Sequence, residues 1–198
     1  MSRREEMLFK NTEFVGYSDL NKKPGFQMGM HRTKDGRYYL YTACFRDNGF
    51  NIVDVTDPAN PVAKWVEGDW VGEVHDGQSL AKLQVADGKL IACYGGTMRV
   101  LHGTHEQPYW GGFKIYDIES DPLNPKLLGQ FECEDGPGVH RSFYNGGDYA
   151  YIMGSKRNFR GYILRIVDIS DPTNPTEVGS WWADGQYLGN KKASDMPE

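Results

Sequence analysis

The chain has 198 residues and a net charge of −5, from 22 Lys and Arg against 27 Asp and Glu. This length fits a single domain, residues 1–198, with a substantial hydrophobic core. No basic stripe dominates the sequence, so no nucleic-acid partner is expected. No apolar run suits a membrane span or a signal peptide, so the default location is the cytoplasm, with a secreted or surface form left open.

Aromatic residues make up 13% of the chain, and its 24 glycines allow many turns, which suits an all-β protein. The three cysteines, Cys44, Cys93 and Cys133, follow no metal-binding spacing. Their odd number and wide separation argue against a disulfide framework. We therefore expect buried free thiols.

The N-terminal region begins with a charged head, residues 1–10, for which no fixed structure is expected. Residues 11–19 follow, and Phe14 to Tyr17 within them have the pattern of a β-strand that completes a sheet. No earlier strand precedes this segment as a partner. The sequence therefore predicts an orphan N-terminal strand.

A phrase that recurs three times organises the rest of the chain. It reads NIVDVTDPANP at residues 51–61, KIYDIESDPLNP at 114–125 and RIVDISDPTNP at 165–175. Its first half, rich in β-branched and aromatic residues, suits a buried strand. The Asp-Pro step opens a turn, and the second proline starts another extended segment. The strand-ending aspartates are expected to accept hydrogen bonds from turn amides: Asp54, Asp117 and Asp168.

Each copy of the phrase belongs to a unit of about four strands. A glycine turn, typical of a tight hairpin, lies upstream at Asp35-Gly36, at Asp87-Gly88 and at residues 145–147. The predicted units span about residues 27–65, 74–131 and 139–182, and residues 183–198 form a polar tail. A four-stranded unit that recurs in this way is typical of a β-propeller blade.

These phrases resemble the LVIVD repeat, which defines a family of β-propeller proteins, and the resemblance covers roughly residues 11–182. It implies a propeller architecture of three four-stranded antiparallel blades plus the orphan strand, and it implies no mechanism. Propellers usually need at least four blades to close. The chain is therefore expected either to form a homo-oligomer or to lack C-terminal blades, and we favour the second reading.

Histidines near the beginning of each unit are candidates for a metal site. They are His31, His75 and His140. If the first strand of each blade begins at one channel mouth, three imidazoles could converge there on Zn or Fe. The alternative, which we favour, is that they are structural histidines bonded to backbone groups around the channel.

The long loop of the second unit, residues 95–112, carries further candidates. His102, His105 and Glu106 are suitable metal ligands or general bases, and Trp110 is a candidate ligand contact in the same loop. Their order does not match a known zinc-protease motif. A surface loop with incidental histidines is the favoured alternative.

A basic segment in the third unit is the last candidate. Lys156, Arg157 and Arg160 flank a phenylalanine between the second and third strands, where three cations could hold a carboxylate or phosphate. This loop and the beginning of the first strand are expected at the same end of the array. A solvated hairpin tip is the favoured alternative.

Taken together, the residues favour a binding or interaction scaffold with a protein partner or a small-molecule ligand. The alternative is a metal-dependent enzyme, an oxygenase, lyase or hydrolase, at the histidine-lined channel mouth. No nucleophile elbow, phosphate-binding loop or dinucleotide motif is present. Whether the chain is an enzyme is left open.

Overall fold

The computed structural model describes residues 10–44, 49–67, 78–96, 110–133 and 136–189. Within these ranges the chain is all-β, apart from a three-residue 3-10 turn, η2 (Leu20–Lys22). No helix of the described residues is long and apolar enough to cross a membrane. The strands are β1 (Gly25–Arg32), β2 (Tyr38–Cys44), β3 (Gly49–Asp54), β4 (Val62–Glu67), β5 (Gln78–Ala86), β6 (Lys89–Gly96), β7 (Gly112–Asp117), β8 (Lys126–Glu132), β9 (Val139–Phe143), β10 (Tyr149–Gly154), β11 (Ile163–Asp168) and β12 (Thr176–Trp181).

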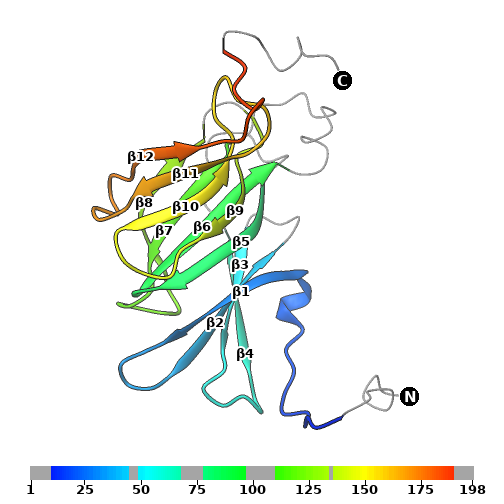
Figure 1. Cartoon of the computed structure of the whole chain (residues 1–198). Coiled ribbons are helices and arrows are strands. Elements are labelled where there is room, and N and C mark those ends of the chain that lie inside the picture. The colour runs from blue at the N-terminus through cyan, green and yellow to red at the C-terminus, as the bar shows by residue number, and fades with distance from the viewer. Residues whose placement is uncertain (1–9, 45–48, 68–77, 97–109, 134–135, 190–198) are drawn as a thin grey trace.

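The strands form three antiparallel four-stranded units, which we call blade one (β1–β4), blade two (β5–β8) and blade three (β9–β12). Figure 1 shows them following one another, from blue and cyan through green to yellow and orange. A single backbone pairing, Cys44 with Leu80, joins the sheets of blades one and two. The first strands lie together, β1 on β5 and β5 on β9. The predicted all-β array of four-stranded blades is confirmed, and its sheets do not close into a ring.

The repeated aspartates end the third strand of each blade, as the sequence predicted. The amide of Thr56 donates to Asp54 at 3.0 Å, that of Glu119 to Asp117 at 2.9 Å, and that of Ser170 to Asp168 at 2.9 Å. These hydrogen bonds favour the charged carboxylates and lower their pKa values, although for Asp54 the largest single influence is burial, which opposes the effect. The same Asp-Pro turn therefore leads into the outermost strand of every blade.

Two apolar cores hold the blades together. One fills the space between blades one and two and includes Tyr41, Phe50 and Tyr94. The other lies between blades two and three and includes Phe113 and Ile152. All three cysteines are buried and free, as predicted. Each core is built from side chains that alternate along the strands, so each blade is stabilised mainly by its neighbour.

The N-terminal segment differs from the prediction. Residues 11–19 form no strand. The residues that follow are tied to blade one by a side chain: Asn51 donates to the carbonyl of Leu20 at 2.9 Å and accepts from Asn21 at 2.8 Å. A strand needs backbone pairing with a neighbouring strand, and no described strand pairs with this segment.

Candidate functional site: the outer face of blade three

His31 is the seventh of eight residues in β1 and is 6% exposed. Its Nε2 lies 3.7 Å from Oε2 of Glu119 and has no hydrogen-bond partner among the described residues. Glu119 also pairs with Lys34 at 2.8 Å. Burial lowers the pKa of His31, and the carboxylate of Glu119 opposes this shift. His31 is thus a buried histidine beside an ion pair.

His140 is the second residue of β9 and is exposed. Its ring stacks on Tyr162, with 5.2 Å between the centroids. Partial burial lowers the pKa of His140, and the positive charges of Arg141 and Lys82 lower it further. Val139 pairs with Gly154, where the second strand of the blade ends. His140 therefore lies at the same end of blade three as the segment between β10 and β11, as the topology predicted.

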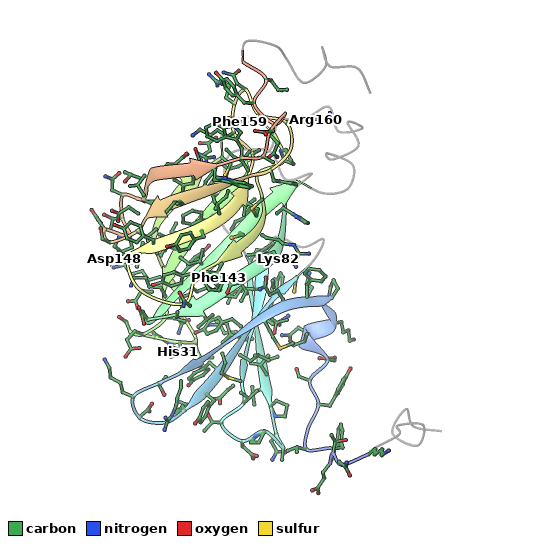
Figure 2. All side chains as sticks on the ribbon, in the orientation of Figure 1. His31, Lys82, Phe143, Asp148, Phe159 and Arg160 are labelled. Carbon is green, nitrogen blue, oxygen red and sulfur yellow. The ribbon has the colours of Figure 1, made fainter. Side chains whose placement is uncertain are left out.

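The structure places His31 and His140 at opposite ends of corresponding strands. His31 pairs with Tyr39, near the beginning of the second strand, whereas His140 lies beside the end of the second strand. In Figure 2, His31 lies far from the labelled Phe159 and Arg160 of the β10–β11 segment. No group of three metal-ligating side chains occurs among the described residues. His75 lies outside them, so the three-histidine metal site stays a prediction.

The candidates of the long loop fall into two groups. His102, His105 and Glu106 lie outside the described residues. Trp110 is 7% exposed and packs edge-on against Tyr94, with 5.8 Å between the centroids, in the core between blades one and two. In this structure Trp110 therefore acts as a core residue.

The basic segment is partly neutralised. Lys156 forms an ion pair with Glu177 at 2.6 Å. Arg157 and Arg160 are exposed, and the backbone amide of Arg160 donates to the carbonyl of Gln186 at 2.8 Å. Lys156 is therefore already paired with a carboxylate in this structure, and the anion site formed by the three cations stays a prediction.

Sequence reasoning missed a buried charge at the first position of the third repeat. Arg165 is 6% exposed, and its Nε and Nη2 donate to Oε2 of Glu177 at 2.8 and 2.6 Å. Its guanidinium also lies 4.7 Å from the ring centroid of Phe131 in blade two. Burial alone would raise the pKa of Glu177, but the bonds from Lys156 and Arg165 lower it overall. The position in the repeat could have indicated this burial, because Asn51 and Lys114 begin the other two repeats and are also buried.

Each blade presents a second face, directed towards the blade that follows, which we call its outer face. On blade two, strand pairing places Ile91 beside Ile115 and Gly129, and the next row contains Cys93 and Phe113. Ile91, Ile115 and Phe113 are 0% exposed, and Cys93 is 1% exposed, because blade three covers them. The corresponding face of blade one, with Tyr41 and Phe50, is buried under blade two in the same way.

The outer face of blade three repeats this arrangement but is open. Tyr151 pairs with both Phe143 and Ile166, and Ile166 pairs with Gly179. Phe143 is 57% exposed, Tyr151 38% and Trp181 63%. We define the outer face of blade three as Phe143, Tyr151, Met153, Leu164, Ile166, Gly179 and Trp181. Such a gathering of exposed aromatic side chains is the type of surface that often lies at interfaces between proteins.

A serial array of four-stranded antiparallel blades defines a protein of the β-propeller class. The family model of the LVIVD repeat matches residues 38–66, in blade one, and 146–182, in blade three. The chain therefore carries LVIVD repeats in blades one and three. No curated protein matches it. Blade two carries the same four strands and the same aspartate-closed turn.

Proposed function

We propose that this LVIVD-repeat chain is a binding scaffold and that a protein partner docks on the outer face of blade three. One observation carries the proposal. The rows of side chains that are covered on blades one and two are exposed on blade three, where they include three large aromatic rings. Aromatic side chains supply much of the binding energy in protein interfaces.

The site supports binding better than catalysis. Its members are apolar and aromatic, and neither a nucleophile with a base nor a metal cluster accompanies them among the described residues. The metal-dependent enzyme remains a prediction that needs His31, His75 and His140 to converge, and no contact in the described part of the chain favours it.

Photo-cross-linking in the native host tests the proposal. A benzophenone amino acid replaces Tyr151, and in the control it replaces Leu127 of β8, whose exposed fraction is also 38%. We expect one adduct of defined mass from position 151, none from position 127, and loss of the adduct when Ile166→Arg places a charge in the face. Failure to form an adduct specific to position 151 would contradict the proposal.

A further inference from the structure

The contact between consecutive blades follows one pattern. The outermost strand of one blade lies on the Asp-Pro turn of the next. In β8, Gly129 lies so close to the turn of blade three that a Cβ atom there would overlap the carbonyl oxygen of Pro172. In β4, Nζ of Lys64 donates to the carbonyl of Leu123 at 2.7 Å, in the turn of blade two. Whatever covers a blade must therefore present such a turn to its outermost strand.

Gly179 in β12 occupies the position of Gly129, but no turn of the described residues lies against it. The nearest atoms that its Cβ would meet belong to Ile166 of its own blade, at 3.6 Å. Blade three therefore keeps the close-approach glycine without the neighbour that requires it. Because glycine has no side chain, this position allows the close approach of an Asp-Pro turn, which an unrelated protein surface would not require.

The other end of the chain holds a turn that could fill this position. The turn of blade two is already in contact with Lys64, and the turn of blade three is already in contact with Gly129. The turn of blade one is covered by Gly16, whose Cβ would overlap the carbonyl oxygen of Pro58. The covering segment, residues 11–19, forms no strand, and its Val15 and Tyr17 are 56% and 69% exposed.

Blade one also exposes an apolar surface near this covering segment. Phe26, Met28 and Met30 of β1 are 49%, 60% and 51% exposed. A pocket of about 450 Å³ lies between the N-terminal segment and blade one, lined in part by Tyr17 and Met28. The N-terminal segment therefore covers this end of the array incompletely.

We propose that the outer face of blade three binds the blade-one end of a second copy of this chain. Gly179 of one copy lies on the Pro58 turn of the other, and residues 11–19 move aside. Reciprocal contacts between two copies join six blades, a number within the usual range of about four to eight for closed propellers. This inference rests on the proposed function, because it names the partner of the same face.

Sedimentation velocity of the whole chain over a range of concentrations tests the inference with Gly179→Leu. We expect the unaltered chain to convert from monomer to a dimer and no further. In the monomer, the first atom of a side chain at 179 meets Ile166 of its own blade at an ordinary contact distance of 3.6 Å. In the dimer, a leucine there would meet the Pro58 turn. It should raise the dimer dissociation constant by about tenfold or more, since overpacking a close contact is costly.

A second variant tests the competing segment. Gly16→Leu forces residues 11–19 off the Pro58 turn and should lower the dimer dissociation constant. Val62→Leu, at a 67% exposed position of β4, is the control and should leave it unchanged. Circular dichroism checks that each variant is folded.

Three outcomes would overturn the inference: a chain that stays monomeric at hundreds of micromolar, a dimer indifferent to Gly179→Leu, or open polymers that grow with concentration. A monomer whose position 151 cross-links to a different protein would overturn the second copy as partner and leave the proposed function intact. If neither a dimer nor a cross-link is found, the second-copy inference and the proposed function are both contradicted.

Discussion

Blades two and three have the same four strands, the same turns and the same kind of outer face, yet only one of these faces is covered. Ile115 of blade two is 0% exposed beneath blade three, whereas its counterpart Ile166 lies on the open face of blade three. A Cβ at Gly129 would overlap the carbonyl oxygen of Pro172, whereas a Cβ at Gly179 would meet Ile166 of its own blade at an ordinary contact distance of 3.6 Å. Because the repeats are alike, the difference comes from the neighbour and not from the blade itself. An open blade therefore keeps the features of a docking surface.

Thiol accessibility gives the largest expected contrast between the two faces. Cys93 lies in the covered face, and burial raises its pKa to about 12, so a thiol reagent should reach it mainly when the blades separate. Tyr151→Cys, on the open face, should react at least about a thousandfold faster in dilute protein, because protection by unfolding is worth several kcal/mol. Mass spectrometry of the labelled chain measures both rates. Equal rates would mean that the two faces do not differ in solution.

Deletion of matched side chains should give the next largest contrast. Ile115→Ala removes packing from a closed core and should lower the free energy of unfolding by about 2–5 kcal/mol. Ile166→Ala, in the same row of blade three, should cost less than about 1.5 kcal/mol because part of its side chain faces water. Urea unfolding at low protein concentration measures both. A similar loss in the two variants would show that something already covers the outer face of blade three.

The two close-approach glycines sharpen the comparison further. Gly129→Ala places a Cβ against the backbone of the next turn and should destabilise the chain by about 1–3 kcal/mol. Gly179→Ala should be neutral, or stabilise the chain by up to about 1 kcal/mol, because alanine restricts the unfolded chain more than glycine does. Thermal unfolding of both variants tests this expectation. The comparison fails if Gly179→Ala is the more damaging change.

The smallest effect concerns the ion pair at the interface between blades two and three. The folded-state pKa of Glu177 is lowered from 4.5, so its contribution to stability is present above that pH and is lost as the pH falls through the folded-state value. Glu177→Gln should therefore flatten the loss of stability below about pH 4.5. Unfolding by urea between pH 3 and pH 6 reports the slope. An unchanged slope would show that Glu177 does not contribute to the acid sensitivity of this interface.

The local features of the fold could be predicted from the sequence. Asp168 and its two counterparts identify the turn chemistry, and the hairpin glycines identify the strand order, because both depend on residues close together in the chain. Residues 11–19 were wrongly predicted as a strand, since strand pairing depends on a neighbouring edge and not on the segment alone. His31 was expected at the beginning of the first strand but lies near the end of β1. Its distance in sequence from the turn glycine does not determine where the strand begins.

The candidate site depended on information that a single repeat does not contain. The pairing of Arg165 with Glu177 joins two strands, and the burial of Trp110 depends on contacts across two blades. Trp181 is a large apolar residue of the kind that usually lies in a core, and only the three-dimensional structure shows that it is exposed. The sequence of a repeat does not show whether another blade covers its outer face, because that depends on the tertiary structure.

The central claim is that the outer face of blade three docks a second copy of this chain, in the way that the equivalent faces of blades one and two dock the blade that follows them. Hydroxyl-radical footprinting of Tyr151, Met153 and Trp181 over a range of protein concentrations tests it most directly. We predict that all three side chains are oxidised readily in dilute protein and become protected together as the concentration rises, with no such protection in the Gly179→Leu variant. Oxidation that stays the same at every concentration, or protection that the variant retains, would contradict the claim.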